Sequence, residues 1–257
     1  MLLIILSSII YSQNFLTVDK LDQKLIDLTF NDEYVEVKRI CDSLSQLDKH
    51  NPRYYFHYFG ADALQLHGKI NSSPLNGRDS VREVLVEKSL EKLEIAIQLL
   101  DDIPETPRKR VYIASLHGYY SRYAALNQSW WAFYVNGTKA NGMFEDLIEE
   151  YPDCYDAYLY PGVFGYYADR LSGLNGFIAG ILGISGDRKQ GLEYINIALE
   201  KGKTVYPQAL LMVIETKTEM EDNPYKAIPY FEEFLTAYPK NKRVINWYGH
   251  TSLNLNN

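Results

Sequence analysis

The chain has few cysteines, no long basic cluster and almost no strand-like alternation of apolar and polar residues. Two of its 257 residues are cysteine, and neither has a spacing typical of metal sites. The formal charge is −7, and the basic clusters are as short as Arg108–Arg110, so nucleic acid is not an expected partner. A composition that is 46% apolar and 23% charged is nevertheless that of a folded globular protein.

Motifs that carry catalysis are also missing from the sequence. The glycine-rich run 173–180 lacks the Gly-Lys-Ser/Thr ending of a phosphate loop, and the five histidines form no His-Glu-x-x-His motif. We therefore predict no catalytic residue, no cofactor and no metal site. The alternative is an enzyme whose site is assembled from dispersed residues, and its candidates are His117, Tyr119, Arg122, Asp169 and Arg170.

The first twelve residues predict export. The apolar run Leu2–Ile10 is too short to span a bilayer but fits the core of a secretory signal. We expect cleavage after Ser12, a periplasmic or secreted protein, and no membrane-spanning segment in the mature chain. Two alternatives are that the segment is retained as a weak membrane anchor, or that it forms a buried strand or helix.

Apolar residues recur at helical spacing along nearly the whole chain after residue 20, which predicts an all-α fold. Pro161 and Pro229 lie inside two expected helices, where each should produce a kink. Short breaks rich in Pro, Gly, Asn and Asp separate the helices, so consecutive helices should be antiparallel neighbours. The expected helices cover residues 19–30, 32–49, 53–68, 79–101, 107–127, 129–150, 154–170, 187–202, 206–221, 224–237 and 241–254.

Two segments repeat one pattern of a small, an aromatic, an apolar and a proline residue. They are Ala140-Phe144-Leu147-Pro152 and Ala227-Phe231-Phe234-Pro239, and in both each position follows the one before it by four, three and then five residues. The pattern resembles the second helix of the tetratricopeptide repeat. The close helix contact of that family's first helix is matched by four glycines, Gly60, Gly118, Gly162 and Gly249.

The resemblance implies antiparallel helical hairpins stacked as a right-handed solenoid over residues 13–257, with an irregular all-α bundle as the alternative. The stretch from Asp156 to Leu192 also resembles a poorly characterised subgroup of bacterial exported tetratricopeptide proteins. In such a stack Cys41 and Cys154 would lie more than two repeats apart, so we expect two small core residues without a disulfide.

Tyrosine is abundant, with 22 residues. The resemblance implies that the first helix of each repeat lines a concave groove, and the alternative for each ring is packing between helices. We predict a non-enzymatic protein–protein interaction scaffold of the bacterial envelope that binds a peptide or protein in this groove. A protein that binds a glycan or small ligand on stacked tyrosines is the alternative. The predicted partner-binding residues are Tyr54, His57, Tyr112, Tyr119, Arg122, Tyr123, Tyr166 and Tyr167, with Asp156 beside them.

Two further groups of apolar residues have expected places. Trp130, Trp131, Phe133 and Tyr134 surround one second helix, and we expect them to pack in the core. The insert 171–186 carries six large apolar residues at helical spacing, and we expect a short helix that folds back onto the solenoid, with a docking surface as the alternative. These six residues are Leu171, Leu174, Phe177, Ile178, Ile181 and Leu182.

Overall fold

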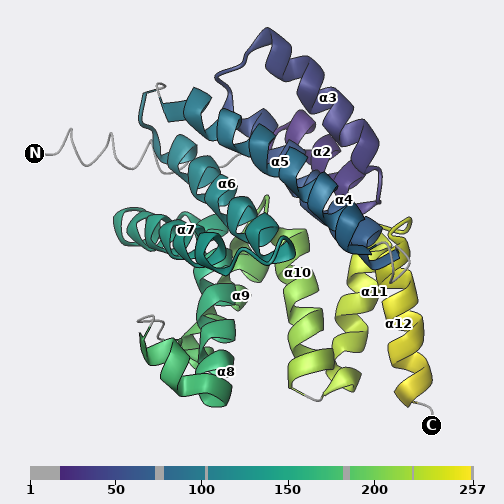
Figure 1. Cartoon of the computed structure of the whole chain (residues 1–257). Coiled ribbons are helices and arrows are strands. Elements are labelled where there is room, and N and C mark those ends of the chain that lie inside the picture. The colour runs from purple at the N-terminus through teal and green to yellow at the C-terminus, as the bar shows by residue number, and fades with distance from the viewer. Residues whose placement is uncertain (1–17, 73–77, 102–103, 182–185, 222, 256–257) are drawn as a thin grey trace, which may run out of the picture. The chain divides into compact units, whose positions relative to one another are not determined.

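A computed structural model describes residues 18–72, 78–101, 104–181, 186–221 and 223–255, with the helix path alone at 71–72, 78–81 and 171–181. In these ranges the chain forms helices and no strand (Figure 1). The all-α prediction is confirmed. The described helices begin and end within a few residues of the expected boundaries, with the exceptions given below.

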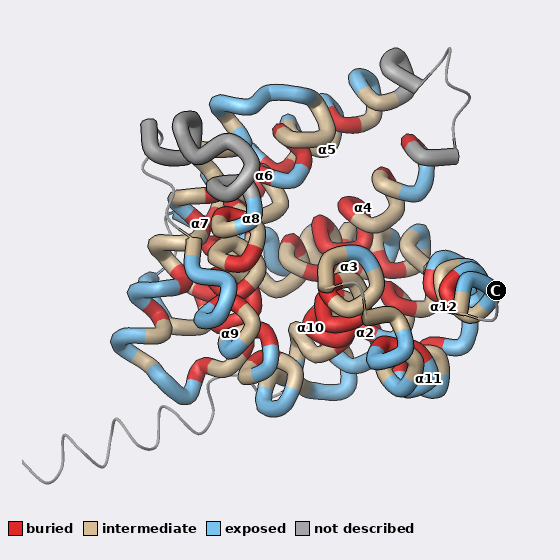
Figure 2. The backbone as a smooth tube through the Cα atoms, turned by 90° about the horizontal axis from the view of Figure 1, so that it is seen from below, coloured by how far each residue is buried: buried red, intermediate tan, exposed pale blue. Residues whose placement is uncertain are grey.

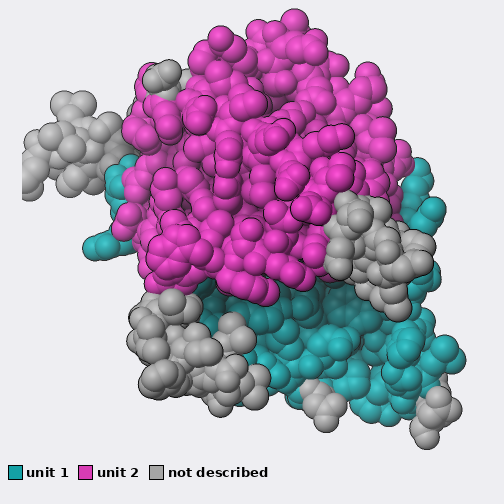
Figure 3. Space-filling view, in the orientation of Figure 1, with its two compact units in different colours: residues 1–23, 148–257 teal, residues 24–147 magenta. Residues whose placement is uncertain are grey.

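The structure divides into two compact units (Figure 3). Unit 2 comprises residues 24–147, and unit 1 comprises residues 1–23 and 148–257. Unit 2 is built from α2 (Lys20–Phe30), α3 (Tyr34–Leu47), α4 (Pro52–Ser72), α5 (Arg78–Asp101), α6 (Pro107–Leu126) and most of α7 (Trp130–Glu150). Unit 1 contains η2 (Tyr155–Tyr158), α8 (Leu159–Ile181), α9 (Arg188–Lys201), α10 (Tyr206–Glu215), η3 (Thr216–Met220), η4 (Pro224–Ala227), α11 (Ile228–Ala237) and α12 (Lys242–Leu255).

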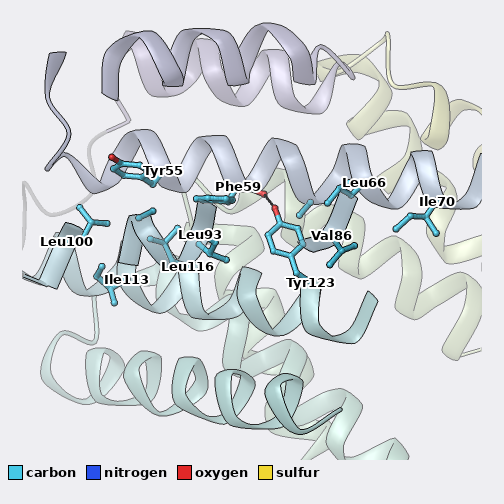
Figure 4. Close-up of a cluster of buried hydrophobic side chains, with 12 residues drawn as sticks. Tyr55, Phe59, Leu66, Ile70, Val86, Leu93, Leu100, Ile113, Leu116 and Tyr123 are labelled. Atoms are coloured by element: carbon cyan, nitrogen blue, oxygen red, sulfur yellow. Dashed lines mark hydrogen bonds between the residues drawn. The ribbon is translucent and has the colours of Figure 1, made fainter. Parts of the chain in front are cut away.

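The core of unit 2 lies between α4, α5 and α6. Helix α4 packs against α3, α5 and α6, and α5 also packs against α6. Phe59, Leu93, Leu100 and Leu116 are fully buried in one cluster (Figure 4). Burying a side chain of this size contributes about 1.5–3 kcal/mol. Along most described helices the buried positions recur at helical spacing between exposed or half-buried ones, as expected for amphipathic helices, whereas α10 has no exposed residue (Figure 2).

The core of unit 1 depends on a close contact between α8 and α9. A Cβ atom on Gly191 would lie 2.7 Å from the Tyr166 backbone nitrogen and 2.8 Å from the Gly162 carbonyl oxygen. On Gly162 it would lie 2.9 Å from the Ile195 backbone nitrogen. The two backbones therefore touch where both helices have glycine, and the sequence prediction for Gly162 is confirmed.

The other glycine predictions have mixed outcomes. A Cβ atom on Gly60 would lie 2.9 Å from the Tyr119 hydroxyl oxygen, which is a close approach to a movable side-chain end. The space around a Cβ atom on Gly249 is open to 4 Å, so the expected tight contact at Gly249 is wrong. Ala140, Phe144 and Leu147 of the repeated pattern are buried, and so are the corresponding residues Ala227, Phe231 and Phe234.

Both predicted proline kinks are wrong. Each of the two helices is divided into a 3₁₀ turn followed by an α-helix, η2 and α8 in one case and η4 and α11 in the other. Pro161 and Pro229 consequently lie in the first turn of α8 and of α11. There a missing backbone N–H costs no helical hydrogen bond, so neither helix has to bend.

Helix α8 continues to Ile181, which differs from the expected end at residue 170 and from the expected separate helix in the insert. The side chains of the six apolar insert residues lie outside the described residues, so neither role predicted for the insert is tested. Asp187 caps α9 as expected, because its carboxylate accepts a hydrogen bond from the Gln190 backbone nitrogen at 2.9 Å. Cys41 and Cys154 are buried and form no disulfide, as predicted.

Candidate partner-binding surfaces

The predicted groove residues divide between the two units and between buried and accessible positions. Tyr54, Tyr119 and Tyr167 are half-buried, and Arg122 is exposed. Four of the predicted residues are buried, namely His57, Tyr112, Tyr123 and Tyr166. Because a partner must touch the side chain it recognises, these four cannot supply the first contact with a partner, and for them the packing alternative holds.

Three predicted residues meet around one ring that the sequence did not single out. The Phe56 ring lies 5.1 Å from the His57 ring, 5.2 Å from the Tyr112 ring and 6.2 Å from the Tyr119 ring, measured between centroids. These separations are typical of interacting aromatic pairs. Phe56 and Tyr119 are half-buried while Tyr112 is buried. The cluster therefore combines two rings that a partner can reach, Phe56 and Tyr119, with rings that are buried.

Arginines flank this cluster on α6. Arg108, Tyr112, Ser115, Tyr119 and Arg122 follow one another at spacings of three or four residues, which places them on one side of the helix. The Arg108 side chain donates a hydrogen bond to the Tyr112 hydroxyl at 3.2 Å and lies 5.7 Å from the ring centroid. We name the accessible surface formed by Phe56, Arg108, Tyr119 and Arg122 the α4–α6 face.

The charge of the two helices differs in sign from that of the whole chain. Together α4 and α6 contain six Lys and Arg residues and one Asp, a formal charge of +5, while the chain carries −7. The single acid, Asp62, is buried and paired with Lys38 at 2.7 Å. Two of the six cations, Arg108 and Arg122, belong to the α4–α6 face, and none of the four residues of the face is acidic.

Three of these cations lie where a helix tolerates them least. Arg108, Lys109 and Arg110 are in the first turn of α6, which contains no acidic residue. The helix macrodipole disfavours each such cation by about 0.3–1 kcal/mol. The buried Lys109 is compensated by the Glu105 carboxylate at 3.2 Å and the Asp101 carbonyl oxygen at 3.4 Å. The local sequence thus keeps positive charge at a cost in helix stability.

Tyr123 is a structural residue. Its ring is fully buried against Phe59, and its hydroxyl donates to the Phe59 carbonyl oxygen at 3.3 Å (Figure 4). The same hydroxyl lies 3.1 Å from the Asp62 carboxylate, to which it also donates. Asp62 also accepts hydrogen bonds from Lys38 and from Ser89. Burial raises the pKa of Tyr123 well above its usual value. This network joins four helices of unit 2, so the predicted groove role of Tyr123 is corrected to one in the core.

Tyr166 and Tyr167 hold the end of α10 in unit 1. Tyr166 donates to Glu221 and Tyr167 donates to Glu215, both at 2.5 Å. Arg188 from α9 pairs with the same Glu221, and Arg170 donates to the Met220 carbonyl oxygen at 2.8 Å.

The tyrosines and arginine of α8 thus fix both ends of η3, a π-helical turn. The hydrogen bond from Tyr166 and the charge of Arg188 lower the pKa of Glu221, while burial raises the pKa of Tyr167. Both predicted residues have a bridging role between helices.

Asp156 is buried and is not a groove residue. One of its carboxylate oxygens accepts hydrogen bonds from the backbone nitrogens of Lys203, Thr204 and Val205 at 2.6 to 3.1 Å, and from the Thr204 hydroxyl at 2.6 Å. The carboxylate therefore satisfies the turn between α9 and α10, which would otherwise leave several N–H groups unpaired.

Many tyrosines of this chain are used in the same way, as hydroxyl donors to carboxylates. The interhelix pairs such as Tyr120 with Glu94, at 2.7 Å, combine a packed ring with a satisfied polar end. This use of tyrosine explains much of its abundance without a ligand. Such pairs are formed by Tyr34, Tyr120, Tyr123, Tyr155, Tyr166, Tyr167, Tyr206 and Tyr248.

The aromatic residues at the start of α7 have the opposite environment from the one predicted. Trp130 is 66% exposed, Trp131 71% and Phe133 40%. Core packing is therefore wrong for these three residues, and Tyr134 is half-buried. Trp130 and Phe133 continue the helical spacing of the buried residues Gly137 and Ala140. The sequence therefore indicated the side of the helix that is buried, but not that this burial stops before the first two turns.

The candidates for a dispersed enzyme site have structural contacts. His117 is buried, and its Nδ1 lies 3.0 Å from the Asn136 amide oxygen. Burial lowers its pKa, so the neutral form is favoured. His117, Tyr119 and Arg122 belong to unit 2, and Asp169 and Arg170 belong to unit 1. Within the described ranges, no group of three or more His, Cys, Asp or Glu side chains is arranged to hold a metal ion.

The hydropathy of the described helices adds one finding about membranes. None of the helices in the described ranges combines the length and the apolar character needed to cross a bilayer.

Comparisons of the chain with family models, with curated proteins and with solved structures give no match. The tetratricopeptide resemblance of the sequence therefore stays a prediction, and the argument for function depends on the residues of this chain.

Proposed function

We propose that the protein is a non-enzymatic protein–protein interaction scaffold of the bacterial envelope, exported by its first twelve residues. The α4–α6 face binds a peptide or protein segment. The observation that carries this proposal is the pairing of half-buried Phe56 and Tyr119 with Arg108 and Arg122 on one surface of unit 2. Aromatic residues and arginine are the types most enriched at protein interfaces.

The charge of the face indicates the kind of segment that binds. Its four residues include two arginines, Arg108 and Arg122, and no acid. An arginine guanidinium forms its strongest contacts with carboxylates, which it can bind through two hydrogen bonds. We therefore expect the bound segment to contain Asp or Glu next to an apolar or aromatic residue that covers Phe56 and Tyr119.

Adjacent tyrosines of α6 provide a matched test of this function. Tyr119 belongs to the α4–α6 face, whereas the next residue, Tyr120, bonds to Glu94 of α5. A partner captured from envelope extracts by the unaltered protein should be lost with Tyr119→Ala and with Arg122→Gln, and kept with Tyr120→Ala. Equal capture by all three variants would refute the assignment of the face, provided that their melting temperatures show folded proteins.

Glycan binding is the second candidate function, and few aromatic rings are accessible enough to stack on a sugar. Sugar stacking needs an open ring face, and of the aromatic cluster on α4 and α6 only Phe56, Tyr119 and neighbouring Tyr54 are half-buried rather than closed. A thermal-shift screen with soluble glycans tests this candidate. A stabilising glycan whose effect disappears in Tyr119→Ala would favour it over a peptide.

A further inference from the structure

The first two turns of α7 form the most exposed aromatic surface among the described residues. Trp130, Trp131, Phe133 and Val135 lie within six residues, and each is at least 40% exposed. From Gly137 onward the same helix side is buried through Ala140, Phe144 and Leu147. We name the exposed part, Trp130 to Val135, the α7 aromatic ridge. A contiguous apolar surface of this kind on a folded protein marks a contact with another molecule or with a membrane.

The ring geometry makes this surface convex. Trp130 packs edge-on against Phe133 at 6.3 Å, and Trp131 packs at a tilt against Tyr134 at 5.9 Å, between ring centroids. Neighbouring helix positions point about 100° apart, so the two aromatic pairs diverge from the helix axis. A diverging pair of this type does not form a pocket for an anchor residue. It is suited to enter a soft apolar medium itself.

Two cations beside the ridge favour an anionic medium. Of the five Lys and Arg residues in 106–144, Arg108, Lys109 and Arg110 are in the first turn of α6, at the far end of that helix from α7. The other two are Arg122 and Lys139. Exposed Lys139 follows Val135 by one turn of α7. Exposed Arg122 follows Ser121, whose hydroxyl donates to the Phe133 carbonyl oxygen at 2.8 Å. Both cations therefore lie close to the ridge in the α6–α7 hairpin.

We propose that the α7 aromatic ridge docks on the surface of an anionic lipid bilayer. Trp130, Trp131 and Phe133 enter the boundary between headgroups and acyl chains, while Arg122 and Lys139 contact lipid phosphates. Tryptophan is suited to this boundary because its ring is apolar and its N–H remains hydrogen-bonded. Basic residues next to such rings add attraction to anionic lipids. The contact is peripheral, and it shares Arg122 with the α4–α6 face, so the tryptophans of the ridge are the residues that distinguish it from that face.

The chain supplies its own reporter for this contact. It has three tryptophans, and two of them are on the ridge. The third, Trp247, lies on α12 with its ring against Phe231 at 5.3 Å. In a Trp247→Phe protein, the tryptophan emission, excited at a wavelength that tyrosine does not absorb, therefore comes from the ridge alone. We expect a blue shift of emission and co-sedimentation with vesicles of phosphatidylglycerol and phosphatidylcholine in equal parts, and little of either with phosphatidylcholine alone.

Variants separate the ridge from the net charge of the protein. In co-sedimentation, Trp130→Ala with Trp131→Ala should reduce vesicle binding by about tenfold or more. Arg122→Gln with Lys139→Gln should reduce it by about fivefold or more, and added salt should have the same effect. The control is Tyr225→Ala, which removes a side chain with 67% exposure from unit 1 and should leave binding unchanged.

Three results would overturn the proposal. The first is a tryptophan emission spectrum that is unchanged by anionic vesicles. That result would mean that the ridge does not enter the bilayer, as expected if the overall charge of −7 keeps the protein away from an anionic surface. The second is a blue shift without lipid that grows with protein concentration and accompanies a doubled mass, because the ridge would then bind a second copy. The third is a blue shift of the tryptophan emission when a captured protein binds, together with no shift when vesicles are added, because the ridge would then bind that protein. Loss of partner binding by Tyr119→Ala bears on the α4–α6 face alone.

Discussion

The α6–α7 hairpin contains two aromatic groups of similar size in opposite environments. Tyr123, near the end of α6, is fully buried, and its hydroxyl is bonded to Phe59 and Asp62. Trp130 and Trp131, seven and eight residues later, are mostly exposed. The difference teaches that ring size does not decide burial in this chain. A ring is buried where a neighbouring helix both covers it and offers its polar end an acceptor.

The largest effect on the free energy of unfolding is expected when the buried ring of Tyr123 is removed. Tyr123→Ala removes a fully buried ring and leaves Asp62 without one of its donors. We expect a loss of about 3–5 kcal/mol in the free energy of unfolding, because a cavity remains at the centre of unit 2. Urea denaturation followed by circular dichroism measures it. A loss close to that of an exposed residue would show that the ring is not covered as described.

The contact between α8 and α9 gives the next largest effect. A methyl group on Gly191 meets backbone atoms of Tyr166 and Gly162 within 2.8 Å, and backbone cannot move aside cheaply. Gly191→Ala should therefore destabilise the protein by about 1–3 kcal/mol through overpacking.

A matched control for Gly191→Ala should change the free energy of unfolding in the opposite direction. Gly142→Ala, in α7, introduces the same methyl group where the surrounding space is open to 4 Å. Alanine has the higher helix propensity, so this variant should gain up to about 1 kcal/mol. Thermal unfolding of the two variants side by side is the measurement. Two shifts of the same sign would contradict the close approach of the two helix backbones.

The tyrosine hydroxyls that bond to carboxylates should make the fold sensitive to alkali. Burial and the hydrogen bond to Glu94 raise the pKa of Tyr120 to about 12, and burial also raises the pKa of Tyr123 and Tyr167. The pKa of tyrosine in the unfolded chain is about 10. Because the folded pKa is the higher one, this stabilisation is complete below pH ~10 and is lost as the pH rises through about 12.

Urea midpoints measured between neutral pH and pH ~12 test the alkaline sensitivity. Tyr120→Phe should show a smaller decline over the upper part of this range than the unaltered protein, since one titrating hydroxyl is gone. Superimposable profiles would show that this tyrosine does not contribute to the pH dependence of stability.

The smallest effect is expected at the exposed member of the comparison. Trp131→Ala removes a ring that is 71% exposed, so the free energy of unfolding should change by no more than about 0.5 kcal/mol. The measurement is the same urea denaturation used for Tyr123→Ala. A loss of several kcal/mol would place Trp131 in a packed core, as the sequence had predicted, and would remove the basis of the membrane proposal.

Much of the fold could be predicted from the sequence because the determining interactions are local. Asp187 caps α9, and Ala140, Phe144 and Leu147 form a buried stripe, as their spacing indicated. The candidate site was predictable only in part. Tyr119 and Arg122 are accessible as expected, but Phe56, at the centre of the aromatic cluster, was not among the predicted residues. The available signal was that Phe56 lies four residues before Gly60, one of the glycines marked as a close helix contact.

The sequence by itself determined which side of each helix is apolar, since a period of 3.6 residues fixes the direction of every side chain. It also marked Gly162 as a place where two helix backbones can touch, but only the structure showed that Gly191 is its counterpart and that Gly249 makes no such contact. What faces each apolar side was decided by the tertiary structure alone. Trp130 and Ala140 share one side of α7, yet a neighbour covers Ala140 and leaves Trp130 in water. Burial depends on contacts between distant segments, and helical spacing carries no information about them.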